Sequence, residues 1–258
     1  MVGIRSSTTT DAPAGPPGAT RLHTTNVGLT IASMFIDLST TEHSWRAMHR
    51  LYLSFVLPRP IAFASTVDES GRLNLAPFSF YNMMSANPPV VVFSPALNRH
   101  SQPKDTLRNI QMTKEFVIAT VTESIAERMN ICSTEFDHGI SEFEKSGLTP
   151  VPAKKIKGFL VKESLVNIEC RLRQVVSLGD QPGAGQVVFG DVVAVHVDDA
   201  VLAPGDMVCD AMKLRAVSRM GGSQYGRTTD IFELDSIRDP AEYVQKGAAK
   251  MRPHRPMP

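Results

Sequence analysis

Strand-like apolar segments follow one another along this chain, with short turns between most of them. Residues 60–67, 73–85, 89–97, 115–121, 167–176 and 185–202 are rich in β-branched and aromatic residues, as buried strands are. Short connections join antiparallel neighbours, because a parallel pair needs a long crossover. The sequence therefore predicts a mainly β, closed or nearly closed barrel. Helices are predicted at 104–116, at 122–133, near Glu142 and, before the barrel, in the amphipathic segment 44–52, and a helix or a loop is expected after residue 206.

The first predicted hairpin carries more polar residues than a buried strand pair needs. Its hydroxyl and amide side chains include Ser65, Thr66, Asn74, Ser79 and Asn82. Pro77 lacks an N–H and is confined to a sheet edge or a break in a strand. A break there leaves neighbouring backbone groups able to bind something else. We interpret this hairpin as one wall of a slot for a flat anionic cofactor.

A phosphate-binding device is predicted one strand further along the chain. Arg99 and Lys104 are cationic, Thr106 carries a hydroxyl, and a helix is expected to start near Asp105 as its N-cap. The first amides of a helix and the aligned peptide dipoles attract anions. The alternative is that Asp105 only caps a helix and that Lys104 is only solvated.

For several other residues, we favour a role in the fold over a role in ligand binding. In the alternating segment 167–176, Ile168 and Cys170 share one face, and Glu169 lies on the other. His196 is interpreted as a satisfied structural histidine, and the alternative is that alternation points it into the cavity. Met83 and Met84 are expected to fill gaps in the core.

Composition excludes several function classes. The net charge is +1, so no basic field indicates nucleic-acid binding. The three cysteines are widely spaced, and no Cys or His pair has zinc-ligand spacing, so neither a disulfide framework nor a metal site is expected. No apolar run reaches the about 18 residues of a membrane span, and no secretory signal is visible. We expect a soluble cytoplasmic protein.

Several segments, taken in order from about residue 52 to residue 225, resemble one family. They are "LPRPIAFASTVDESGRLNLAPFSFYNMMSANPPVVVFS", "KDTLRNI", "EFVIATV", "GQVVFGDVVAVHVDD" and "SRMGGSQY". Together they resemble the flavin reductase-like family of FMN-binding split β-barrels. The resemblance implies a six-stranded antiparallel Greek-key split β-barrel with short peripheral helices. It also implies a homodimer with FMN at the subunit interface.

The resemblance also implies roles for single residues. Ser65 and Thr66 are expected to contact the ribityl chain or the ring edge of FMN, and Ser79 and Asn82 to add polar contacts. Four residues are expected to line the ring, partly through their backbone: Asn74, Ala76, Pro77 and Phe78. Three are expected to hold the phosphate: Arg99, Lys104 and Thr106. Arg219 and Tyr225, near a glycine pair, are expected either to close over the flavin or the second substrate, or only to flank a turn.

Family members typically reduce flavin with NADH or NADPH, and the expected function is hydride transfer from such a donor to flavin N5. A monooxygenase is then a candidate partner, besides a small-molecule substrate. The alternatives are an FMN-binding electron carrier, a flavoenzyme acting on a small aromatic compound, and an interaction module without flavin. The expected organisation is a flexible tail over residues 1–27, the FMN-binding domain over 28–235, and a C-terminal tail or arm over 236–258.

Overall fold

The chain divides into two units, Met1–Phe55 and Val56–Pro258. The computed structural model describes residues 20–22, 33–40, 43–137, 139–234 and 252–253. In the first unit, β1 (Thr20–Leu22) pairs antiparallel with β2 (Ser33–Phe35), and the helix predicted before the barrel is α1 (Trp45–Phe55). The predicted tails at 1–27 and 236–258 lie almost wholly outside the described residues. The proposed domain boundaries therefore stay predictions.

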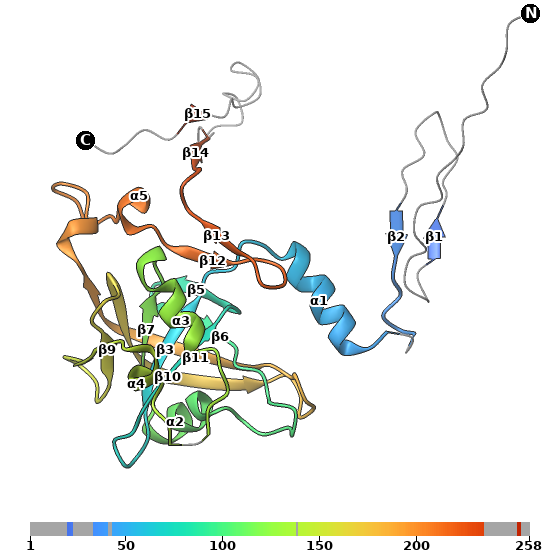
Figure 1. Ribbon diagram of the computed structural model, residues 1–258, viewed down its shortest axis with the longest axis horizontal. Coiled ribbons are helices and arrows are strands. Elements are labelled where there is room, and N and C mark those ends of the chain that lie inside the picture. Colours follow the sequence, from blue (N-terminus) through green and yellow to red (C-terminus); the bar gives the residue numbers. More distant parts are fainter. Residues whose placement is uncertain (1–19, 23–32, 41–42, 138, 235–251, 254–258) are drawn as a thin grey trace, which may run out of the picture. The chain divides into compact units, whose positions relative to one another are not determined.

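The second unit is built on one antiparallel sheet (Figure 1). Its strand order is β4-β3-β7-β10-β11-β6-β5. The bounds are Ala62–Val67 for β3, Leu73–Phe78 for β4, Tyr81–Ala86 for β5, Pro89–Phe93 for β6, Glu115–Thr120 for β7, Val166–Ser177 for β10 and Gln186–Val197 for β11.

The two end strands of this sheet are consecutive along the chain. Only Ser79 and Phe80 separate β4 from β5, and the Ser94 N–H donates to the Phe80 carbonyl at 2.9 Å. One bent strand thus pairs with β3 through its first half and with β6 through its second, so the chain itself joins the two ends of the sheet. The predicted split β-barrel is confirmed. Seven strands are found where six were expected, because the bend divides one strand into two.

Short helices and two-residue or three-residue strands surround this sheet. The helices are α2 (Asp105–Thr113), η1 (Glu123–Ile125), α3 (Ala126–Ile131), α4 (Glu142–Ser146), η2 (Asp199–Val201) and α5 (Ala211–Leu214). The small strand pairs are β8 (Pro150–Pro152) with β9 (Phe159–Val161), β12 (Val217–Arg219) with β13 (Tyr225–Arg227), and β14 (Phe232–Glu233) with β15 (Arg252–Pro253).

The expectation that Asp105 is the N-cap of its helix is wrong by one residue. Lys104 occupies the capping position with an extended backbone, and Asp105 is the first helical residue. Its carboxylate accepts from Arg108 Nη1 at 2.8 Å, one turn later. An acidic side chain in the first turn still interacts favourably with the helix dipole, which explains why the sequence pattern resembles a cap.

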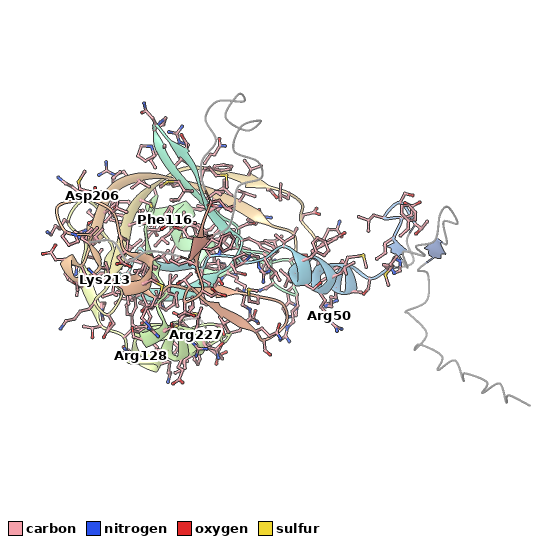
Figure 2. The ribbon with its side chains drawn as sticks, turned by 90° about the horizontal axis from the view of Figure 1, so that it is seen from above. Arg50, Phe116, Arg128, Asp206, Lys213 and Arg227 are labelled. Atoms are coloured by element: carbon pink, nitrogen blue, oxygen red, sulfur yellow. The ribbon has the colours of Figure 1, made fainter. Side chains whose placement is uncertain are left out.

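The inner core of the barrel is aromatic. Phe93 packs between Phe78 and Phe116, with ring centroids 5.4 and 5.6 Å apart. On β11, Gly190 leaves room for this cluster, since a Cβ built there would lie 2.4 Å from Phe116 Cζ. Phe116 is fully buried. In Figure 2 it projects onto the body of the second unit, whereas Asp206 lies toward its edge. Burial of these rings stabilises the closed barrel.

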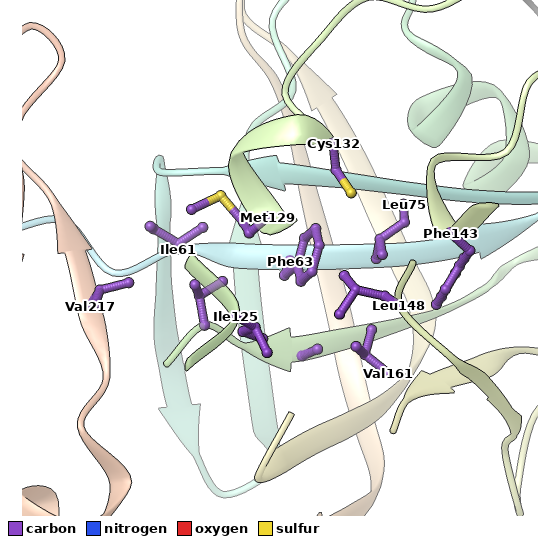
Figure 3. Packing of buried hydrophobic residues seen from close by; sticks show 12 residues of the cluster. Ile61, Phe63, Leu75, Ile125, Met129, Cys132, Phe143, Leu148, Val161 and Val217 are labelled. Atoms are coloured by element: carbon purple, nitrogen blue, oxygen red, sulfur yellow. The ribbon is translucent and has the colours of Figure 1, made fainter. Parts of the chain in front are cut away.

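A second core lies on the other face of β3 and β4, beneath α3 and α4. Phe63 and Leu75 supply its centre from the strands, and Met129 and Cys132 reach it from the end of α3 (Figure 3). Phe143 from α4 completes the cover, and all five side chains are almost fully buried. This packing fixes α3 and the segment after it beside the open edge of β4.

Glu169 on β10 is fully buried, which alternation alone did not predict. It faces away from the barrel interior, as expected, but the segment 154–156 covers it. Its carboxylate accepts from the backbone N–H groups of Lys154, Lys155 and Ile156 at 2.7–3.1 Å and contacts His196 Nε2 at 2.6 Å. Burial alone raises the pKa of Glu169, but these hydrogen bonds outweigh it and hold the pKa below its ordinary value. The structural reading of His196 is supported.

The prediction that Met83 and Met84 fill the core is wrong. Their side chains are 52% and 55% exposed, and neighbouring Phe80 is 46% exposed. The reason is topological, because β5 is an end strand that, among the strands of the described residues, pairs only with β6. The described second unit therefore presents an apolar strip, which consists of Phe80 at the bend and of Met83 and Met84 on β5.

Candidate functional site

A cleft of about 280 Å³ opens beside β4. Three segments form it: the second half of the first hairpin, the loop 98–103 with the start of α2, and the segment 132–136 after α3. Six of the residues predicted to bind a cofactor line this cleft: Asn74, Ala76, Pro77, Phe78, Lys104 and Thr106. Its size is close to the lower end of the range for small-molecule sites, which is about 300 Å³.

A hydrogen-bond network ties the start of α2 to β4. Asn74 Nδ2 donates to Thr106 Oγ1 at 2.9 Å and to Thr66 Oγ1 at 3.2 Å. Asn109 Nδ2 donates to the same Thr66 oxygen at 3.1 Å. Thr66 and Thr106 are each 1% exposed, so Thr66 acts behind the wall of the cleft by positioning Asn74. The polar residues of the hairpin therefore hold the helix tip in place.

The α2 end of the cleft has the chemistry of an anion site, but its two cations are each paired with a carboxylate. The N–H groups of Leu107 and Arg108 donate to the Lys104 carbonyl, whereas the amides before them have no carbonyl within the helix to bind. Lys104 Nζ lies 3.6 Å from a carboxylate oxygen of Glu135, whose side chain is 71% exposed. Arg108 pairs with Asp105. An anion must therefore compete with Glu135, a weak competitor because exposed pairs contribute little.

The open edge of β4 offers acceptors more than donors. The Leu75 N–H points away from β3 and donates to Glu142 Oε2 at 2.9 Å. Because N–H directions alternate along a strand, Pro77 is the next position facing this edge, and proline has no N–H. Burial, together with the nearby Asp105, raises the pKa of Glu142 against the opposing effect of the Leu75 hydrogen bond. Glu142 lines the cleft and holds its proton to higher pH than an exposed glutamate.

The remaining predicted site residues lie outside the lining of the cleft. Ser65 is fully buried on β3, and its Oγ has no hydrogen-bond partner among the described residues. Ser79 lies at the bend and lines an adjoining hollow. Asn82 is exposed on β5, where its side chain accepts from the Met83 N–H. Arg99 is exposed, and its Nε donates to His100 Nε2.

The sequence reasoning missed other residues that line the cleft. Arg108 lies one turn after Asp105, so helical spacing could have placed it near the helix tip. Glu142 and the segment from Cys132 to Phe136 carry no local signal, because the packing of α3 and α4 on the outer core brings them there. The cleft thus combines cations, a helix start, a strand edge and an apolar wall of Pro77 and Phe78. Such a donor set fits a flat ring that carries a phosphate.

Residues 53–215 match the flavin reductase like domain family. The chain belongs to this family. Membership places the flavin reductase-like chain among flavin-binding oxidoreductases and agrees with the split barrel described above. The match includes the cleft and the strands that form it, and it ends before β12 and β13.

Relatives of this flavin reductase-like chain cover most of its length. An uncharacterised protein of Halalkalibacterium halodurans is 39% identical over 78% of this chain and 96% of its own. Among solved structures, nitrilotriacetate monooxygenase component B from Bacillus cereus has a TM-score of 0.74 at 31% identity and covers 80% of this chain and 100% of its own. The 2-nitrobenzoate 2-nitroreductase NbaA of Pseudomonas fluorescens has a TM-score of 0.71 at 30% identity, with 79% and 96% covered.

None of the helices in the described residues has the length and apolar character needed to cross a bilayer.

Proposed function

We propose that this flavin reductase-like chain binds FMN in the cleft and catalyses its reduction by NADH or NADPH. The observation that carries the proposal is the meeting of Lys104, Thr106 and the first turn of α2 with the Pro77–Phe78 wall in one cleft. A helix start with a cation binds phosphate, and the apolar wall suits an isoalloxazine ring.

Each part of the cleft then has a defined task. Lys104, Thr106 and the amides at the start of α2 bind the phosphate. Pro77 and Phe78 pack along the ring, and the carbonyls at the open edge of β4 accept from the ring's N–H. FMN supplies hydride acceptance at N5, and the chain has only to hold the two rings close and exclude water. Ser65, Ser79 and Asn82 remain proposed ribityl or ring-edge contacts, and Arg99 remains a proposed phosphate ligand.

We also propose that the chain works as a homodimer in the cytoplasm. The apolar strip formed by Phe80 at the bend and by Met83 and Met84 on β5 provides a surface for a second copy. The three cysteines are free thiols, as expected in a reducing compartment. A dimer would also bring a second chain to the bend beside the cleft. Asn82 and Arg99 lie outside the cleft lining of their own chain.

The relatives support the expected monooxygenase partner and one of the alternative functions. The Bacillus cereus structure is a monooxygenase component, which favours delivery of electrons to a monooxygenase partner. The Pseudomonas fluorescens structure is a nitroreductase for 2-nitrobenzoate, which favours a small aromatic substrate. Both possibilities retain the same FMN site.

Anaerobic titration of the purified protein tests the proposal. With FMN bound, NADH or NADPH should bleach the flavin absorbance near stoichiometry. If FMN binds and neither nicotinamide bleaches it, while an added reductase does, the electron-carrier alternative replaces the proposal. If FMN changes neither fluorescence nor melting temperature, the cleft is not a flavin site.

A further inference from the structure

A second hollow of about 170 Å³ lies next to the cleft and shares Pro77, Phe78 and Ser133 with it. We call it the side hollow. Its far wall comes from β12 and β13, through Arg219 and Tyr225. A molecule in the side hollow would therefore lie against the occupant of the cleft, which makes it a natural position for a second ligand.

Arg219 gives the side hollow a positive charge that no described acid neutralises. Its guanidinium stacks over the Tyr225 ring at 4.5 Å, and its Nη2 donates to the Gly222 carbonyl. Among the described residues, no carboxylate lies within ion-pair distance of Arg219. Tyr225 is itself placed by a hydrogen bond from its hydroxyl to Asn130 Oδ1 at 3.3 Å. The guanidinium is thus oriented by neutral groups.

A second guanidinium reinforces this field from behind the bend. Arg59 is 4% exposed, and it donates through Nη1 to the Val56 carbonyl and through Nη2 to the Met220 carbonyl, each at 2.7 Å. Its Nε donates to Ser79 Oγ at 3.4 Å, and Ser79 lines the side hollow. Burial, and next the charge of Arg219, lower the pKa of Arg59. An anion beside Arg219 would relieve the repulsion between these two cations.

Apolar side chains supply part of the remaining wall, beside the polar Ser79, Asn130 and Ser133. Ile61 is 6% exposed, Phe78 is 9% exposed and Met129 is 1% exposed. Sulfur and aromatic surfaces such as these pack well against a ring. We propose that the side hollow binds a small aromatic carboxylate, with its ring against Phe78 and Met129 and its carboxylate on Arg219. Its role as second substrate rests on the proposed function, whereas its binding does not.

Calorimetric titration with benzoate and with benzamide tests the proposal directly on the full chain. Benzamide is the matched neutral ligand, so benzoate should bind at least about tenfold more tightly, since hydrogen bonds to charged groups are the stronger ones. Arg219→Gln should weaken benzoate binding by at least about tenfold, and Arg219→Lys should weaken it less. Arg227→Gln is the control, because Arg227 lies on the same strand pair but pairs with Glu123 outside the side hollow.

Binding of FMN to the same variants separates the two proposals. Arg219→Gln should leave the FMN dissociation constant unchanged, and benzoate should bind the FMN-saturated protein. Benzoate binding without any FMN binding would overturn the proposed function and keep the side hollow as an anion site. Equal affinity for benzoate and benzamide, unchanged affinity in a folded Arg219→Gln protein, or loss of the benzoate site on FMN saturation would overturn the inference.

Discussion

Lys104 forms an ion pair with Glu135 in the structure, and this pair leads to a prediction about phosphate affinity. Glu135→Gln removes the competitor at 3.6 Å and should tighten FMN binding, by less than about fivefold because the pair is exposed. Lys104→Ala should weaken FMN binding, more at low salt than at high salt. Flavin fluorescence titration at two salt concentrations measures both effects. Glu144→Gln on α4, outside the cleft lining, is the control, and unchanged affinity in both cleft variants at low salt would contradict the phosphate assignment.

The buried carboxylate of Glu169 leads to a prediction about how the free energy of unfolding depends on pH. The pKa of Glu169 is lower in the folded chain than its ordinary value of 4.5, so its hydrogen bonds stabilise the fold above that pH and are lost as the pH falls through the folded pKa. Glu169→Gln should lower the free energy of unfolding by about 1.5–3 kcal/mol at neutral pH. The difference from the unaltered chain should shrink below pH 4.5. Urea unfolding across pH measures it, and a difference independent of pH would refute the assignment.

At the scale of elements, the sequence predicted the strands and α2 well because their signals are local. Alternation and β-branched residues marked β7 and β10, and helical spacing marked α2 and α3. The bend at Ser79 and Phe80 was indicated only by Pro77. The exposed face of β5 had no local signal, because its position at the end of the sheet depends on which strands pair with it.

Gly190 on β11 makes a prediction about how strands pack inside the barrel. Gly190→Ala places a methyl group 2.4 Å from Phe116 Cζ and 3.3 Å from Cys170 Cβ, and overpacking of this kind costs about 1–3 kcal/mol. Thermal and denaturant unfolding should show the loss. Phe116→Leu in the same chain frees the space, so the double variant should lose less than the sum of the single variants. Additive losses would mean that the two side chains do not compete.

At the scale of the whole molecule, the apolar strip on β5 predicts self-association. Met84→Glu places a charge on this strip without touching either core and should convert a dimer into a monomer in sedimentation experiments. Met112→Glu is the control, since Met112 is similarly exposed, at 48%, on α2. If the unaltered chain sediments as a monomer at micromolar concentration, the proposed homodimer is wrong. If Met84→Glu leaves a dimer intact, the interface lies elsewhere.

The sequence by itself determined the β class, the antiparallel connections, the helix that starts beside Lys104, and the family. These follow from residue periods, turn residues and local order, which act over a few residues. Only the tertiary structure decided which side chains share the cleft. It brought in Glu142 and the segment 132–136, and it placed Asn82 and Arg99 outside the lining. The physical reason is that the packing of two separate cores sets the distance between segments that are remote in the sequence. No local residue pattern encodes that distance.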